Sequence, residues 1–121
     1  MSFLIVFLGG GVGAAARHGV NVVGARVFGT EPALATVAVN VLGSVLMGIA
    51  FVLVAERVVA SDEMRLFAMT GVLGGFTTFS AFALDFTLLL ERGQGALAVG
   101  YAFASVALSI GGLVLGMAIA R

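Results

Sequence analysis

The chain has 121 residues, of which 61% are hydrophobic and 10% are charged, whereas a soluble domain is about 45–50% apolar and ~25% charged. Six basic residues, all arginines, balance six acidic residues, and the chain has no cysteine and one histidine. These counts argue against a basic surface for nucleic acid, thiolate chemistry and a protein-built zinc site. They predict an all-α membrane protein whose surroundings are the lipid bilayer.

Apolar runs in the sequence are long enough for four membrane-spanning helices, each of which needs roughly 20 mostly apolar residues. The predicted spans cover residues of about 3–28, 32–55, 65–90 and 95–120. Pro32 suits the first turn of the second span, where a backbone donor is not needed, and Ser61 suits the N-cap position before the third. We expect residues 1–121 to form a single four-helix transmembrane domain.

The arginines in the loops and at the ends of the spans are divided almost evenly between the two sides of the membrane. The side with both termini and the second loop has Arg57, Arg65 and Arg121, and the other side has Arg26 and Arg92. The positive-inside rule needs a clear excess, so the sequence predicts insertion in both orientations. Oppositely oriented copies would form an antiparallel homodimer with a two-fold axis in the membrane plane. The alternative is that so few loop charges carry no information about orientation.

Glycines in the first span match two different patterns. Gly9, Gly11 and Ala14 satisfy the dinucleotide-binding pattern G-x-G-x-x-G/A, but that site needs a soluble βαβ unit around it. Gly9 and Gly13 also form G-x-x-x-G, the small-residue spacing that lets membrane helices approach closely. The apolar surroundings favour helix contact.

The third span contains a poor helical stretch near its middle, GVLGGFTTFSAF, from Gly71 to Phe82. Two adjacent glycines followed by two adjacent threonines disfavour a continuous helix. Backbone groups freed there must be satisfied by protein, water or ions, and converging carbonyls suit a hard cation such as Na⁺. We expect a broken third helix, and the alternative is a kink whose backbone groups bond to threonine hydroxyls.

Uncharged polar and aromatic side chains recur inside the spans. Phe79 and Phe82 share one helical face, and the electropositive edges of such rings suit a small anion. Asn40 lies near the middle of the second span, between Thr36 and Ser44, and the fourth span has a hydroxyl stripe of Tyr101, Ser105 and Ser109. These groups fit an anion path better than a proton relay, which needs carboxylates or histidine. The alternatives are ordinary ring packing and hydrogen bonds between helices.

Three motifs resemble those of the Fluc (CrcB-type) fluoride channels: GGGVGAAAR in the first span, TVAVNVLG in the second and GVLGGFTTFSAF in the third. The likeness covers essentially the whole chain. It implies a dual-topology antiparallel homodimer with two pores in the bacterial inner membrane, where passive, fluoride-selective conduction gives fluoride resistance. It also implies a structural Na⁺ at the dimer interface, bound by backbone carbonyls of the third helix.

The resemblance implies roles for residues at the matching positions. Gly74 and Thr77 would offer their backbone carbonyls to Na⁺. Phe79 and Phe82 look like the pore phenylalanines whose ring edges meet fluoride, and Asn40 is similar to a pore-lining amide. The other positions implied for the fluoride pore carry hydroxyl groups: Ser80, Tyr101, Ser105 and Ser109.

Two charged residues and three departures complete the comparison with that family. Arg17 and Asp85 are expected to have a vestibule or structural role. His18 stands where tyrosine is usual, Ala81 replaces a common threonine, and Asp85 replaces a usual glutamate. The changes at Ala81 and Asp85 bear on the rate of conduction rather than on the identity of the ion.

The main alternative is a small multidrug-type proton-coupled antiporter, which shares the length, the spans and the dual topology. Such exchangers need an embedded carboxylate, usually in the first helix, where this chain has Arg17 and no acid. Asp85 is the one acid well inside any predicted span. A membrane assembly subunit without ion flux is a second alternative, and an enzyme is not expected because His18 has no evident nucleophile partner.

Overall fold

The structure is a computed structural model that describes residues 1–27, 29, 31–57 and 61–121. The predicted end of the first span at Phe28 lies outside these residues. Every regular element in the described chain is helical: α1 (Ser2–Val27), α2 (Pro32–Ala50), the π-helical η1 (Phe51–Arg57), α3 (Asp62–Arg65), the π-helical η2 (Leu66–Leu73), α4 (Gly74–Phe76), α5 (Phe79–Glu91) and α6 (Gly95–Ala120).

Within the described residues, four stretches are long and apolar enough to cross a membrane: Ser2–Val27, Pro32–Glu56, Asp62–Glu91 and Gly95–Ala120. The second stretch joins α2 to η1, and the third contains α3, η2, α4 and α5. The prediction of an all-helical chain with four helices able to span a membrane is therefore confirmed.

Local sequence sets where these helices begin and turn. Pro32 is the first residue of α2, and the Ser61 side chain accepts a hydrogen bond from the Met64 amide at 3.2 Å, which confirms its predicted capping role. Gly29 and Gly93 have φ angles of 72° and 75° in the connections after α1 and α5. Glycine adopts this left-handed conformation without steric cost, so it can reverse the chain there.

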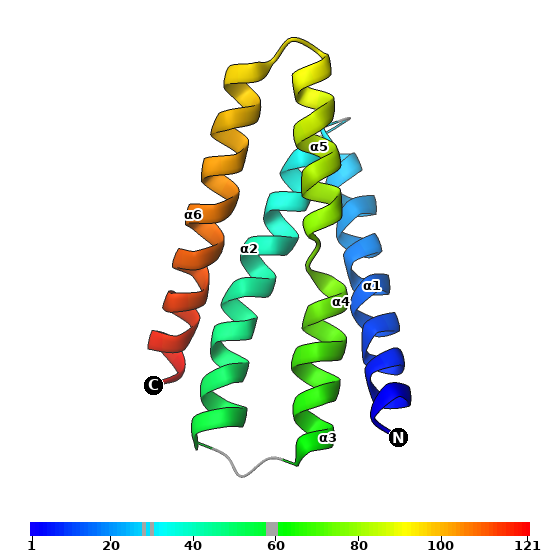
Figure 1. The fold of residues 1–121 in the computed structure, drawn as a ribbon, viewed down its shortest axis with the longest axis vertical. Coiled ribbons are helices and arrows are strands. Elements are labelled where there is room, and N and C mark those ends of the chain that lie inside the picture. The colour runs from blue at the N-terminus through cyan, green and yellow to red at the C-terminus, as the bar shows by residue number, and fades with distance from the viewer. Residues whose placement is uncertain (28, 30, 58–60) are drawn as a thin grey trace.

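The helices form two pairs that lie side by side along the long axis of the molecule (Figure 1). α2 packs along α6, whereas α1 packs against η2 and α4, and α5 contacts both α2 and α6. Both termini, the end of η1 and the start of α3 lie at one end, and the turn between α5 and α6 lies at the other (Figure 1). This agrees with the side assignment used in counting the arginines.

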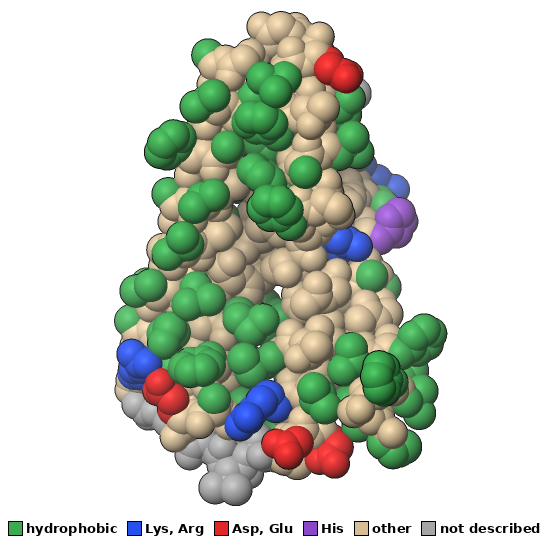
Figure 2. Space-filling view, in the orientation of Figure 1, with side chains coloured by type: hydrophobic (Ala, Val, Ile, Leu, Met, Phe, Trp, Pro, Cys, Tyr) green, Lys and Arg blue, Asp and Glu red, His purple; other side chains and the backbone are tan. Residues whose placement is uncertain are grey.

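Hydrophobic side chains cover much of the drawn face, and charged side chains gather mainly near its lower end (Figure 2). In the most apolar window of each span, at most 28% is buried inside the subunit. The small buried cluster joins Ala33 of α2, Leu89 of α5, and Ala98 and Tyr101 of α6. Most apolar surface of the isolated subunit therefore remains available to lipid or to a second subunit.

Glycines bring the helices of each pair into backbone contact. A Cβ on Gly13 of α1 would overlap the Val72 carbonyl of η2, and one on Gly9 would lie 3.0 Å from the Gly71 Cα. The same relation joins α2 to α6, because a Cβ on Gly116 would overlap the Val45 carbonyl. These contacts confirm the interpretation of G-x-x-x-G as a helix-packing motif. The glycines that match the dinucleotide-binding pattern lie inside the continuous helix α1, where no such turn exists.

Replacing Gly13 by alanine is expected to destabilise the protein, since the new methyl group would overlap a backbone carbonyl that cannot rotate away. Overpacking of this kind costs about 1–3 kcal/mol. Unfolding of the purified protein in detergent measures the loss. Gly11→Ala is the matched control, because nothing lies within 4 Å of a Cβ on Gly11. Equal stability of the two variants would contradict the packing assignment.

Candidate functional site

Two residues with extended backbone separate α4 from α5 near the middle of the third span. Thr77 has φ −82° and ψ 156°, and Thr78 has φ −152° and ψ 124°. The last carbonyls of α4 and the first N–H groups of α5 therefore lie at helix ends, where partners must come from outside the helix ladder. The Leu73 carbonyl, just before α4, still accepts hydrogen bonds from the Thr77 N–H at 3.1 Å and from the Thr77 hydroxyl at 3.0 Å.

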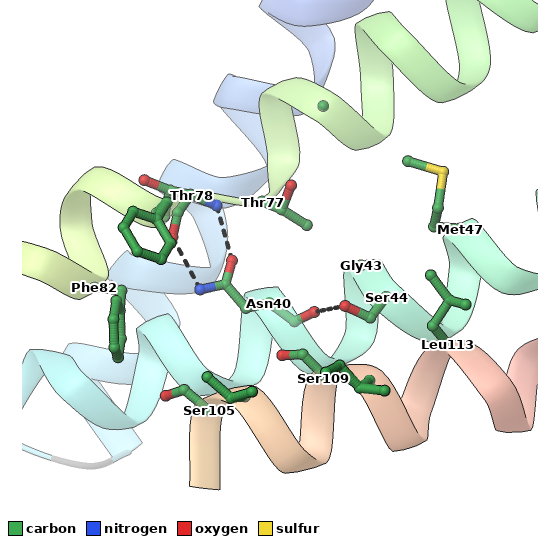
Figure 3. Close-up of a pocket in the computed structure, with 14 residues that line it drawn as sticks. Asn40, Gly43, Ser44, Met47, Thr77, Thr78, Phe82, Ser105, Ser109 and Leu113 are labelled. Carbon is green, nitrogen blue, oxygen red and sulfur yellow. Dashed lines mark hydrogen bonds between the residues drawn. The ribbon is translucent and has the colours of Figure 1, made fainter. Parts of the chain in front are cut away.

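Asn40 of α2 supplies partners for this extended segment. Its Nδ2 donates to the Thr78 carbonyl at 2.9 Å, and its Oδ1 accepts from the Thr78 N–H at 2.8 Å (Figure 3). The Thr78 hydroxyl in turn accepts from the Ala81 N–H at 3.2 Å, so Thr78 is the N-cap of α5. Side chains thus satisfy the backbone groups of Thr78 and Ala81 at the start of α5.

A hollow of about 550 Å³ opens beside the extended segment, between α2, α6 and the third span (Figure 3). We call it the first hollow. Asn40, Thr78 and Phe82 lie at its polar end, and Met47 and Leu113 lie at its apolar end (Figure 3). The other residues that line it are Gly43, Ser44, Gly74, Thr77, Phe79, Ser105, Val106, Ser109 and Ile110. Among the described residues, no charged side chain lines it.

Two phenylalanine rings stand at the polar end of the first hollow. The Phe79 side chain is 77% exposed in the single subunit, and its ring centroid lies 5.3 Å from that of Phe82 at an interplanar angle of 49°. Phe82 also stacks on Tyr101 at 5.2 Å and 22°. Beside them, the buried Ser105 hydroxyl has no hydrogen-bond partner among the described residues. Ser105 also lines the first hollow, so its hydroxyl is a candidate hydrogen-bond donor to a molecule bound there.

Asp85 is buried behind this wall and bonded to hydroxyl groups from two other helices. Its Oδ2 accepts from the Thr36 hydroxyl of α2 at 2.7 Å and from the Tyr101 hydroxyl of α6 at 3.1 Å. The carboxylate therefore links α2, α5 and α6, while the Tyr101 ring supports Phe82 from behind. Sequence reasoning noted the polar residues but missed this triad, since their positions in the chain do not show which side chains meet.

A second hollow of about 500 Å³ lies between α1 and α5 on the other side of Thr78. It is lined by Ala14, Arg17, His18, Asn21, Thr78, Ser80, Ala81 and Leu84. Arg17 is half-buried there, and His18 is exposed. The residues of the GGGVGAAAR motif and of the TTFSA segment thus meet in three dimensions around one polar space.

The sequence-predicted site residues fall into three groups. Those around the first hollow are Asn40, Gly74, Thr77, Phe79, Phe82, Ser105 and Ser109. Ser80 and Arg17 line the second hollow, and Tyr101 and Asp85 form the buried pair. No group of three or more His, Cys, Asp or Glu in the described chain could hold a metal ion. A cation bound beside the extended segment would therefore need carbonyl or hydroxyl oxygens as its ligands.

Fold and site together define a multi-pass membrane protein with a polar, uncharged hollow at mid-span. Residues 4–117 match the family described as CrcB-like protein, Camphor Resistance (CrcB), and the chain belongs to this family. It is 53% identical over 121 residues to "Fluoride-specific ion channel FluC 2" of Nitrobacter hamburgensis, which covers 100% of this chain and 98% of that protein. It is 50% identical over 121 residues to "Fluoride-specific ion channel FluC" of Rhodopseudomonas palustris, with the same coverage.

Removing the Tyr101 hydroxyl is expected to destabilise the helix bundle while leaving the ring stack intact. Tyr101→Phe takes away one hydrogen bond to a carboxylate, and such bonds contribute about 1.5–3 kcal/mol. The free energy of unfolding in detergent measures the effect. Thr87→Ala is the control, because the exposed Thr87 hydroxyl bonds only to the Ala83 carbonyl of its own helix. A Tyr101→Phe protein as stable as the control would refute the linking role of Asp85.

Proposed function

We propose that this protein is a channel that conducts fluoride selectively and passively across the cell membrane. The observation that carries the proposal is the first hollow at mid-span, which is lined by Phe79, Phe82 and Ser105. Among the described residues, the Ser105 hydroxyl has no partner and no charged side chain lines the hollow. Relatives of about the same length and about half identical in sequence are named fluoride-specific ion channels, which supports the same conclusion. The expected result for the cell is fluoride efflux and fluoride resistance.

The physical difficulty for such a channel is the hydration of a small anion. Moving even a carboxylate-sized ion from water to a medium of low dielectric costs of order 20 kcal/mol, and fluoride is smaller. Hydroxyl donors from Ser105 and Ser109 and the electropositive edges of Phe79 and Phe82 offer replacements for water. Because these groups carry no fixed charge, they let the ion leave again. A membrane potential that is negative inside drives the anion outward.

An antiparallel homodimer would complete this site. In the single subunit, Gly74 and Phe79 are exposed beside the extended backbone of Thr77. Irregular backbone does not face lipid within the hydrocarbon core. A second copy of the chain would bury this surface in a protein interface. The near balance of arginines supports dual topology, which would set the two copies head to tail around a two-fold axis in the membrane plane.

We also propose a structural Na⁺ held by the Gly74 and Thr77 carbonyls of both copies. The residues present fit such an ion, because hard cations prefer oxygen ligands and the extended backbone at Thr77 interrupts the helix ladder that would otherwise occupy these carbonyls. When bound, Na⁺ would supply positive potential at the centre of the dimer and hold the interface together. The interruption of the third helix would therefore supply carbonyl oxygens to the cation, in addition to lining the first hollow.

The remaining proposed roles follow from position. Arg17 and Ser80 line the second hollow, where they would attract and receive anions at a vestibule. Tyr101 belongs to the pore through the ring stack with Phe82, and Asp85 holds its hydroxyl. The antiporter alternative gains no support, because α1 contains no acid and Asp85 lines neither hollow.

Liposomes containing the purified protein are expected to release fluoride and to retain chloride. Phe79→Ile and Phe82→Ile should each slow fluoride release about fivefold, since a ring-edge contact contributes about 1 kcal/mol and ~1.4 kcal/mol at the barrier is tenfold in rate. Phe103→Ile is the matched control, because Phe103 is 75% exposed on α6 and lines neither hollow. Wild-type rates in both ring variants, with the assembly intact, would overturn their assignment as pore walls.

Dual topology predicts that one position is accessible from both sides of the membrane. The natural chain has no cysteine, so Gln94→Cys in the turn between α5 and α6 provides a single label site. We expect a membrane-impermeant maleimide to label comparable fractions of the protein in right-side-out and in inside-out vesicles. Labelling in only one kind of vesicle would exclude the antiparallel assembly.

A further inference from the structure

Two backbone N–H groups near the extended segment donate to side chains instead of to helix carbonyls. In a continuous α-helix each N–H donates to the carbonyl four residues earlier, so Thr78 would donate to Gly74. Here the Thr78 N–H donates to Asn40 Oδ1 at 2.8 Å. In the same way the Ala81 N–H would donate to Thr77, but it donates to the Thr78 hydroxyl at 3.2 Å.

These two hydrogen bonds leave the Gly74 and Thr77 carbonyls without the N–H donors that a continuous helix would supply, and we call them the released carbonyls. The carbonyl just before them, on Leu73, keeps its helical partner, the Thr77 N–H, at 3.1 Å. Gly74 and Thr77 also line the first hollow. The Leu73 carbonyl thus accepts the last regular helical bond before the extended segment, and Asn40 Oδ1 and Thr78 Oγ1 accept from the N–H groups that would otherwise donate to Gly74 and Thr77.

The surroundings of Asn40 are shaped to hold it in this position. The Ser44 hydroxyl donates to the Asn40 carbonyl at 2.7 Å, within α2 (Figure 3). A Cβ on Gly43 would overlap the Thr77 Cγ2, so glycine at that position lets the extended segment lie against α2. The Asn40 Nδ2 also donates to the Thr78 carbonyl at 2.9 Å. Both ends of the carboxamide are thus engaged with backbone.

We propose that Asn40 and Thr78 are positioning residues for the cation: their side chains take the two N–H groups and so keep the released carbonyls available to Na⁺. Thr78 is followed directly by Phe79, so the same contacts set the start of α5 and the direction of the first ring. The cation site and the ring wall are thereby built by one set of hydrogen bonds. This inference rests on the proposed function, because it takes the Na⁺ from there.

The test measures how Na⁺ raises the thermal stability of the purified, full-length protein in detergent, with choline replacing Na⁺ at constant ionic strength. The wild type should be stabilised by Na⁺. Asn40→Ala and Thr78→Val should need about tenfold more Na⁺ for half of the effect, the loss typical when a group that positions a metal ligand is removed. Thr87→Val is the matched control with an unchanged midpoint, because the exposed Thr87 hydroxyl donates to the Ala83 carbonyl of its own helix and contacts neither Asn40 nor Thr78.

A conservative variant separates positioning from a general loss of folding. Thr78→Ser keeps the hydroxyl acceptor and should restore the Na⁺ midpoint lost in Thr78→Val. Where Asn40→Ala does not fold, the pair Thr78→Val and Thr78→Ser still decides the matter. A raised midpoint in Thr78→Ser, or a wild-type midpoint in Thr78→Val, would overturn the proposal.

Fluoride flux from liposomes distinguishes this inference from the proposed function. A wild-type protein that releases no fluoride would refute the channel, while the Na⁺ measurements would stand by themselves. If Asn40→Ala loses fluoride flux but keeps the wild-type Na⁺ midpoint, Asn40 contacts the anion directly and the positioning role is wrong. A wild type whose stability does not respond to Na⁺ would also overturn it.

Discussion

A lipid bilayer offers no hydrogen-bond partners to a polypeptide backbone, so every peptide group at mid-span must find one within the protein or in a bound ion or water. The extended residues Thr77 and Thr78 create this demand in the middle of the third span. Asn40 meets part of it with two hydrogen bonds, and the Thr78 hydroxyl meets another part. The shape of the first hollow, the direction of α5 and the proposed cation site all depend on this arrangement.

Close packing allows a chain with so few polar groups to hold that arrangement. Gly13 and Gly116 bring the helices of each pair within backbone contact, and Gly43 allows Thr77 to lie against α2. Small residues give van der Waals contact where lipid and side chains are equally apolar and the hydrophobic effect gives little preference. Close contact between helices thus positions the residues of the first hollow, whose hydrogen-bond donors are uncharged hydroxyl and amide groups.

Much of the fold was predictable because its signals are local. Hydropathy alone indicated the four spans, Gly9 and Gly13 indicated a close helix contact without naming its partner, and the run from Gly74 to Thr78 indicated a poor helix in the third span. The pairings across the bundle were not predictable. Asn40 meets Thr78 across 38 residues, and Thr36 meets Asp85 across 49. Such bonds depend on helix rotation and offset, which a single sequence does not encode at short range.

Thr78 lines both hollows, and among the described residues it alone is common to their walls. A change of this side chain therefore alters both hollows at once. A substitution of Thr78 that is meant to reshape the second hollow near Arg17 would also disturb the first hollow beside Asn40. It would disturb the N-cap of α5 as well. Selective redesign must therefore start from helices that line one hollow only: α6 for the first hollow and α1 for the second.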